Sequence, residues 1–171
     1  MRWKSIIKAG IIITVFFMMT IECKTDIIAT QPANKTVKLF LGDFDQGEVV
    51  CEDYVTKRQP NENDEAFLTR LLKIPSDQQG NYILGIPNDA RIKELKLDKK
   101  HDCIAINMTK DYESMNYGSL AEYLALQSLL NTVTYYYNVH KAVIEVDGKP
   151  YASGHIEFQK GEVIDVSGTI R

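Results

Sequence analysis

Residues 118–150, GSLAEYLALQSLLNTVTYYYNVHKAVIEVDGKP, decide the fold of this chain, because they predict one long helix, a tight turn and a strand. At the start of the helix, Ser119 and Glu122 have the spacing of a capping box, in which each side chain accepts a hydrogen bond from the other residue's backbone amide. An apolar stripe then repeats as one helix face does; its members are Leu126, Leu129, Leu130, Val133 and Tyr137.

The residues after this helix predict its end and a following strand. Asn138 tolerates the left-handed backbone conformation that often stops a helix. Ala142, Ile144 and Val146 fall on every second position, as in a strand with one buried face. Asp147-Gly148 supplies a turn. All of these residues predict a scaffold rather than chemistry.

The rest of the chain predicts an α+β domain. A capped apolar stripe predicts a helix at 63–73, and alternating or β-branched segments predict strands at 37–41, 48–56, 92–97 and 103–108. Two more short strands are expected near 156–158 and 161–166. This order suggests a two-layer sandwich in which one mixed sheet carries both helices on one face. A domain of about 135 residues can bury a full core without a metal or disulfide.

The pattern also predicts which side chains face the core. In segment 48–56 these are Val49, Cys51 and one of the pair Tyr54 and Val55, and in segment 92–97 they are Leu95 and Leu97. The connection 76–89 carries several apolar residues, so we expect it to pack against the domain. For Cys51 and Cys103 we favour two buried free thiols over a disulfide, which would need close and well-aligned strands.

The N-terminus predicts export. Arg2, Lys4 and Lys8 precede an uncharged apolar run at 9–21, which is typical of an export signal. The run is also nearly long enough to span a membrane if Lys8 snorkels to the headgroups. The basic flank places the remainder of the chain outside the cytoplasm.

Cys23 follows this run at the position where a bacterial lipoprotein carries its lipidated cysteine. Thr20 and Glu22 depart from the usual Leu and small-residue positions of such a signal, so lipidation of Cys23 and an uncleaved anchor both stay open. We therefore expect a signal or anchor at 1–23, a polar tether at 24–36 and the domain at 37–171.

Charge argues against nucleic acid as a partner. Without residues 1–23, the 20 basic and 23 acidic residues of the whole chain become 17 and 22, a net charge of −5. A mildly acidic domain without a basic stripe does not have the electrostatic footprint of a nucleic-acid binder.

The sequence contains no motif that predicts catalysis, a metal or a cofactor. The turn GDFDQGE at 42–48 fails the calcium-loop pattern, since its fifth and twelfth positions are Gly47 and Tyr54. The three histidines are dispersed and lack zinc-site spacing. Ser119 is better explained as a helix cap than as a nucleophile.

Tyr135-Tyr136-Tyr137 is the one unusual surface feature of the sequence. These side chains point about 100° apart on a helix, which places Tyr135 with Leu120 and Leu124 on the side away from the apolar stripe. The three could pack beneath the connection 109–117. They could instead form an exposed aromatic-aliphatic patch that binds a partner, and we take Leu120, Leu124 and Tyr135 as candidate partner-binding residues.

The run from Val37 to Phe158 resembles the GerMN domain, the sporulation and spore-germination domain of Gram-positive bacteria. Residues 118–122 (GSLAE) and 126–134 (LQSLLNTVT) are similar to that family's glycine-serine start of a long helix and its Asn-Thr-Leu-Thr type ending. Similar in the same way are the strand and turn at 139–150, Gly154-His155-Ile156, the helix at 66–73 and the turn Ile86-Pro87-Asn88-Asp89. The last lacks the family's turn glycine.

This resemblance implies a non-enzymatic binding or assembly module at the bacterial cell envelope, similar in fold to ring-building domains of sporulation machinery. Its partners would be envelope or sporulation proteins, with the membrane reached through the N-terminus and a homo-oligomer left open. The alternative is a cell-wall (peptidoglycan) binding or remodelling factor. A hydrolytic enzyme is disfavoured because no nucleophile, metal motif or enclosed acid pair is found.

Overall fold

The structure, a computed structural model, describes residues 35–73, 82–115 and 117–166. These residues all belong to one compact unit, Pro32–Arg171. In chain order the elements are β1 (Lys35–Asp43), β2 (Glu48–Thr56), α1 (Asp64–Leu71), β3 (Tyr82–Ile83), β4 (Ile92–Asp98), η1 (Lys99–His101), β5 (Cys103–Met108), η2 (Lys110–Ser114), α2 (Ser119–Tyr137), β6 (Lys141–Val146), β7 (Lys149–Pro150) and β8 (Ile164–Asp165). The predicted signal or anchor, the candidate lipidation site Cys23 and most of the tether lie outside the described residues.

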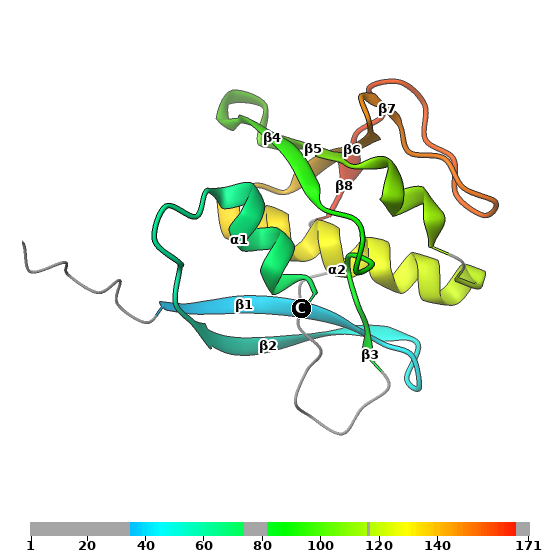
Figure 1. The fold of residues 1–171 in the computed structure, drawn as a ribbon. Helices are drawn as coiled ribbons and strands as arrows, with labels where there is room; N and C mark the ends of the chain where they lie inside the picture. Colours follow the sequence, from blue (N-terminus) through cyan, green and yellow to red (C-terminus); the bar gives the residue numbers. More distant parts are fainter. Residues whose placement is uncertain (1–34, 74–81, 116, 167–171) are drawn as a thin grey trace, which may run out of the picture. The chain divides into compact units, whose positions relative to one another are not determined.

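The α+β class is confirmed, but the strands form two sheets instead of the single mixed sheet expected. One sheet has the order β2-β1-β3, and the other has the order β4-β5-β6-β7, with β8 also paired to β6. Both helices lie between the two sheets (Figure 1). The physical reason is the character of α2, which is buried around most of its circumference and so needs cover on more than one side.

The strands of the β2-β1-β3 sheet are antiparallel, whereas the β4-β5-β6-β7 sheet contains both antiparallel and parallel pairs. β1 and β2 pair antiparallel along their full length, from Lys35 opposite Thr56 to Asp43 opposite Glu48. β4 and β5 form an antiparallel hairpin with a bulge near the start of β4. β5 and β6 run parallel, and α2 makes the crossover between them, as parallel neighbours require.

The ends of α2 confirm one expectation and correct another. Asn138 is the left-handed residue that stops the helix, with φ 51° and ψ 60°. The capping box is wrong: Gly118 is the N-cap, and no side chain caps the helix start. Glu122 is instead buried, and its Oε1 accepts a hydrogen bond of 2.6 Å from the Tyr151 hydroxyl. The hydrogen bond from Tyr151 thus takes the place of the predicted hydrogen bond between Glu122 and the Ser119 amide.

Two other local expectations are confirmed. Asn63 caps α1, where its Oδ1 accepts a hydrogen bond of 2.9 Å from the Ala66 amide. Asp147 and Gly148 both have positive φ, 47° and 75°, as a two-residue hairpin turn between β6 and β7 requires.

The facing of two strands corrects the sequence interpretation. In β2, Val50 and Tyr54 pack on the core, whereas Cys51 and Val55 are exposed, because β2 faces the core with its even-numbered residues. Leu97 is 42% exposed near the turn of the β4–β5 hairpin, while Leu95 packs on the core as expected. Cys51 and Cys103 are free thiols, as expected, but Cys51 is exposed and Cys103 is half-buried.

Candidate functional site

The candidate site begins at one edge of β1. Backbone groups of successive residues in an antiparallel strand point to alternate edges, so Thr36, Lys38, Phe40 and Gly42 present theirs on the side away from β2. Among the described residues, β3 pairs with this side only at Gly42 and Asp43. The strand edge before Gly42 therefore needs another partner.

Helix α2 supplies that partner at Phe40. The Phe40 amide donates a hydrogen bond of 3.1 Å to Thr132 Oγ1, and the Ser128 hydroxyl donates to the Phe40 carbonyl. Ser128 and Thr132 are four residues apart, so they lie on one face of the helix. Both are fully or almost fully buried. In Figure 1, α2 runs along β1 on the side opposite β2, in the place of a strand.

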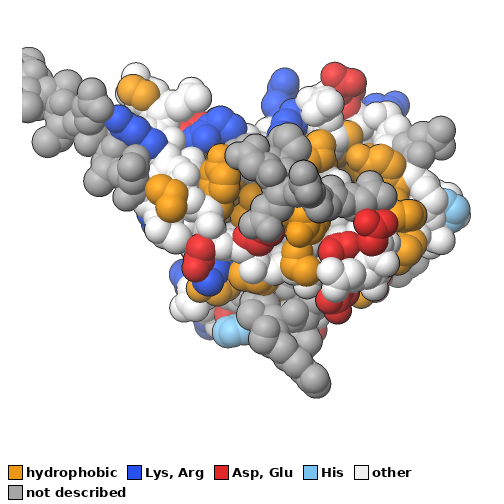
Figure 2. Space-filling view, turned by 90° about the horizontal axis from the view of Figure 1, so that it is seen from below, with side chains coloured by type: hydrophobic (Ala, Val, Ile, Leu, Met, Phe, Trp, Pro, Cys, Tyr) orange, Lys and Arg blue, Asp and Glu red, His pale blue; other side chains and the backbone are white. Residues whose placement is uncertain are grey.

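Beyond Thr132 a small hollow opens between β1 and the last turns of α2. We call it the β1-edge hollow, and its volume is about 200 Å³. Residues 35–38 form one wall, Tyr135 and Tyr136 the other, and the buried Leu68 and Leu71 of α1 line its apolar part. In Figure 2, Lys and Arg side chains stand beside hydrophobic ones at the left of the view, where β1 begins.

The two tyrosines of this wall, Tyr135 and Tyr136, are held in different ways. The Tyr135 ring packs on Phe40, with ring centroids 5.7 Å apart, yet it stays 45% exposed. Tyr136 is anchored through its hydroxyl, which accepts a hydrogen bond of 2.6 Å from Arg58 Nη2. The Lys35 ammonium lies 5.1 Å from the centre of the Tyr136 ring, a cation–π distance.

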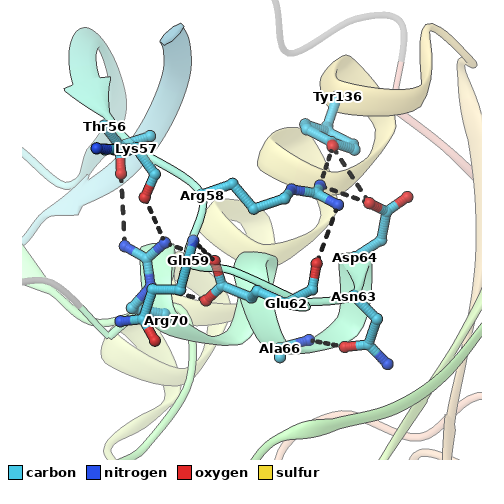
Figure 3. Close-up of polar contacts among 10 residues, drawn as sticks. All are labelled: Thr56, Lys57, Arg58, Gln59, Glu62, Asn63, Asp64, Ala66, Arg70 and Tyr136. Atoms are coloured by element: carbon cyan, nitrogen blue, oxygen red, sulfur yellow. Dashed lines mark hydrogen bonds and ion pairs between the residues drawn. The ribbon is translucent and has the colours of Figure 1, made fainter. Parts of the chain in front are cut away.

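Figure 3 shows how the loop between β2 and α1 fixes Tyr136. Arg58 Nη2 lies 2.5 Å from Asp64 Oδ1, at the first turn of α1. The Tyr137 hydroxyl donates a hydrogen bond of 2.6 Å to the other oxygen of Asp64. Nearby, Arg70 binds both carboxylate oxygens of Glu62 at 2.8 Å. The loop, α1 and the end of α2 are thus joined by ionic hydrogen bonds.

The protonation states follow from these contacts. Burial raises the pKa of Asp64, but the hydrogen bonds from Tyr137 and Arg58 outweigh it, so the net pKa is lowered. Burial, followed by the charge of Asp64, raises the pKa of Tyr136. Asp64 is therefore ionised and Tyr136 neutral near pH 7, and the network holds one wall of the hollow in place.

The structure does not bring the three candidate partner-binding residues together. Tyr135 borders the β1-edge hollow. Leu120 is 43% exposed but lies 15 residues earlier on α2, about 22 Å along its axis. Leu124 is fully buried, so it is no surface residue: a Cβ atom on Gly42 of β1 would lie 2.7 Å from the Leu124 Cβ. Neither sequence interpretation of the cluster holds, because β1, rather than the connection 109–117, covers Leu124.

Three further features of the described residues bear on metal binding, on the GDFDQGE turn and on the membrane. No group of three or more His, Cys, Asp or Glu side chains in the described ranges could hold a metal ion. Asp43 of the GDFDQGE turn accepts hydrogen bonds of 3.0 Å from the amides of Asp45 and Gln46, as a hairpin tip requires. Within the same ranges, no helix has the length and apolar character needed to cross a bilayer.

Comparison with known families identifies the fold. The family described as "Germane: Sporulation and spore germination" matches residues 38–152, which is more than half of the chain. The chain belongs to the Germane family. The match includes most of β1, both helices and the Tyr135–Tyr136 wall of the hollow, and it confirms the resemblance over residues 38–152.

Solved structures support the fold of this Germane domain. The tandem GerMN domains of the sporulation protein GerM from Bacillus subtilis superpose with a TM-score of 0.55 at 16% identity, covering 74% of this chain and 45% of that one. This chain therefore spans about half of the tandem structure.

Two further structures are similar at lower scores. The first GerMN domain of the same Bacillus subtilis protein gives a TM-score of 0.46 at 16% identity, covering 73% of this chain and 94% of that one. A Clostridium perfringens protein described as a candidate lipoprotein gives 0.49 at 20% identity, covering 79% and 89%. The comparison with curated proteins finds no match to this chain.

Sequence reasoning missed most of the hollow. Lys35, Lys38 and Tyr136 were not candidates, because nothing in their spacing shows that β1 lacks a strand partner there. One signal was present: Ser128 and Thr132 are polar residues four apart in a mostly apolar helix. Such a pair indicates that the helix face contacts a backbone rather than apolar side chains.

Proposed function

We propose that this chain is a non-enzymatic binding module that acts in sporulation or spore germination. It would be tethered to the extracytoplasmic face of the cell membrane. A partner protein would dock over the β1-edge hollow and its Tyr135 wall. The observation that carries this proposal is the Germane match over residues 38–152, in a domain whose described surface offers an aromatic-walled hollow. The hollow is smaller than the roughly 300–1,000 Å³ of typical small-molecule sites, which favours a macromolecular contact.

The docking site can be tested with two exposed tyrosines of the same helix. Tyr135 borders the hollow, whereas Tyr123 is 49% exposed and lies about 18 Å away along α2. The full chain, crosslinked and recovered from sporulating cells, should lose about tenfold of its specific partner with Tyr135→Glu, the size of an interface hot spot. Tyr123→Glu should recover the wild-type amount.

Three results would overturn the docking proposal. One is equal recovery with Tyr135→Glu and Tyr123→Glu. Another is that the wild-type chain sediments with purified cell wall and no protein partner is recovered, which would favour the peptidoglycan-binding alternative. A third is recovery of only further copies of this chain, which would make it a self-assembling module.

The membrane tether rests on the N-terminal sequence and is a separate proposal. If Cys23 is lipidated, the chain from cell membranes should carry a diacylglycerol mass on a peptide beginning at Cys23. An intact N-terminus without that mass, in the wild-type chain from cell membranes, would show an uncleaved anchor instead.

A further inference from the structure

The edge of β1 has three different surroundings along the seven residues from Gly42 back to Thr36. Gly42 pairs with β3, and Phe40 bonds the side chains of Ser128 and Thr132. At Lys38 and Thr36 the backbone groups on this edge have no hydrogen-bond partner among the described residues. The backbone groups on this edge of β1 are therefore hydrogen-bonded at Gly42 and Phe40 and, within the described ranges, unpaired at Lys38 and Thr36.

The helix explains why the edge opens. One turn after Thr132, α2 presents Tyr135 and Tyr136 in place of a short hydroxyl side chain. The Tyr135 ring packs on Phe40, and the Tyr136 hydroxyl is held by Arg58. Neither hydroxyl bonds the backbone of β1, so the rings leave a space beside the strand.

We propose that the β1-edge hollow binds an extended segment of a partner protein, which adds as a strand to β1 at Thr36 and Lys38. This inference rests on the proposed function and names the mode of binding. An unpaired strand edge is a template for another extended backbone, because its alternating donors and acceptors match only a second strand. The volume beside it suits a side chain of that segment.

The walls indicate the chemistry of the segment. Leu68 and Leu71 line the inner part of the hollow, so a side chain that reaches them must be apolar. On the rim, Lys38 already pairs with Asp53 at 2.7 Å, whereas Lys35 contacts the Tyr136 ring and has no carboxylate partner among the described residues. The segment is therefore apolar at one position and acidic nearby.

A copy of the chain's own β2 strand is a suitable probe. Residues 48–56, EVVCEDYVT, already pair antiparallel with β1 on its other edge, and they carry both apolar and acidic side chains. The probe is this nine-residue peptide with the substitution Cys51→Ser, titrated into the full, isotope-labelled chain in mild detergent. We expect saturable binding, with the Thr36 and Lys38 amide signals shifting and gaining protection from hydrogen exchange.

The decisive variants are Lys38→Pro and its control Lys38→Ala. Both remove the Lys38–Asp53 ion pair, but only proline removes the amide that faces the open edge. Proline is tolerated at such edge positions, so pairing with β2 should persist. Lys38→Pro should weaken peptide binding at least about tenfold relative to Lys38→Ala, the cost of a lost interface hot spot. If Lys38→Pro fails to fold, Thr36→Pro and Thr36→Ala make the same comparison at the strand end.

Two outcomes would overturn the strand-addition proposal. One is the absence of saturable binding up to about 1 mM peptide, the weak end of specific affinity. The other is equal binding by the proline and alanine variants, which would mean that side chains alone make the contact. In that second case the loss of a cellular partner with Tyr135→Glu would still stand, so the proposed function and the strand addition can fail separately.

Discussion

The backbone amide of Phe40 donates a hydrogen bond to the side chain of Thr132, so a helix hydroxyl occupies the place of a neighbouring strand. Ser128 completes the arrangement by donating to the Phe40 carbonyl. A buried strand edge with unpaired backbone groups would be costly, and these two side chains remove that cost. The helix and the strand are thereby fixed in register as well as in contact.

Thr132→Val tests this relationship directly. The change keeps the side-chain shape but leaves the buried Phe40 amide without an acceptor, so we expect a loss of about 1–3 kcal/mol in the free energy of unfolding. Urea denaturation measures the loss, and the Phe40 amide should exchange faster with solvent. The same substitution at Thr109, whose hydroxyl accepts only from the exposed Arg91 amide, should cost less. Equal costs would contradict the role assigned to Thr132.

Leu120 and Leu124 lie one helical turn apart but should respond very differently to a charge. Leu124 is fully buried against β1, so Leu124→Glu would bury an unpaired carboxylate and should cost more than about 4 kcal/mol, enough to unfold a marginal domain. Leu120 is 43% exposed, and Leu120→Glu should stay within about 0.5 kcal/mol of the wild type. Thermal unfolding separates the two, and similar midpoints would refute the assigned burial.

Tyr151 and Tyr112 form a second matched pair. Their rings pack edge to face with centroids 5.3 Å apart, but only the Tyr151 hydroxyl has a partner, the buried Glu122. Tyr151→Phe should cost about 1–3 kcal/mol, because it leaves a buried carboxylate without its donor. The Tyr112 hydroxyl is buried without a hydrogen-bond partner among the described residues, so Tyr112→Phe should be neutral or slightly stabilising. A larger loss for Tyr112→Phe in urea denaturation would reverse this assignment.

Glu62 should make stability depend on pH. Hydrogen bonds from Arg70 hold the pKa of Glu62 below its ordinary value of 4.5. A carboxyl with a lowered pKa in the folded state stabilises the fold above its unfolded pKa, and this stability is lost as the pH falls through the folded pKa. Glu62→Gln should therefore cost about 1.5–3 kcal/mol near pH 7, the range for hydrogen bonds to charged groups, and progressively less below about pH 4.

The control for Glu62 is the exposed ion pair between Lys38 and Asp53. Asp53→Asn should leave the free energy of unfolding at pH 7 almost unchanged, as expected for a solvent-exposed pair. Urea denaturation at pH 3, 5 and 7 compares both variants with the wild type. If Glu62→Gln lowers the free energy of unfolding by the same amount at every pH, the stabilisation by the Arg70–Glu62 contact does not depend on the charge of Glu62.

Local chemistry made parts of the fold predictable. Asn63, Asn138 and the Asp147-Gly148 turn were predictable because each satisfies a backbone requirement within a few residues. The facing of β2 was not, because Val49, Val50, Cys51 and Val55 all fit a buried face and only pairing with β1 decides between them. The division into two sheets was also not predictable, because it depends on which strands cover the side of α2 that faces away from β1.

The candidate site was predictable only through Tyr135. Its neighbours in the β1-edge hollow come from β1 and α1, which lie some 60 to 100 residues earlier in the chain. The capping box failed for a similar reason, because Tyr151 competes for Glu122 from 29 residues away. In each case a distant residue outweighs a short-range pattern that is sound by itself.

The unbroken register of β1 with β2 has a mechanical consequence. β1 is the first described element after the N-terminal segment, and its first residue, Lys35, lies opposite the last residue of β2. Tension directed along β1 would load all the rungs of the ladder together, whereas tension across the strand would open them one after another from the Lys35–Thr56 end. The resistance of the domain to such a pull is therefore set by the angle at which the chain enters β1.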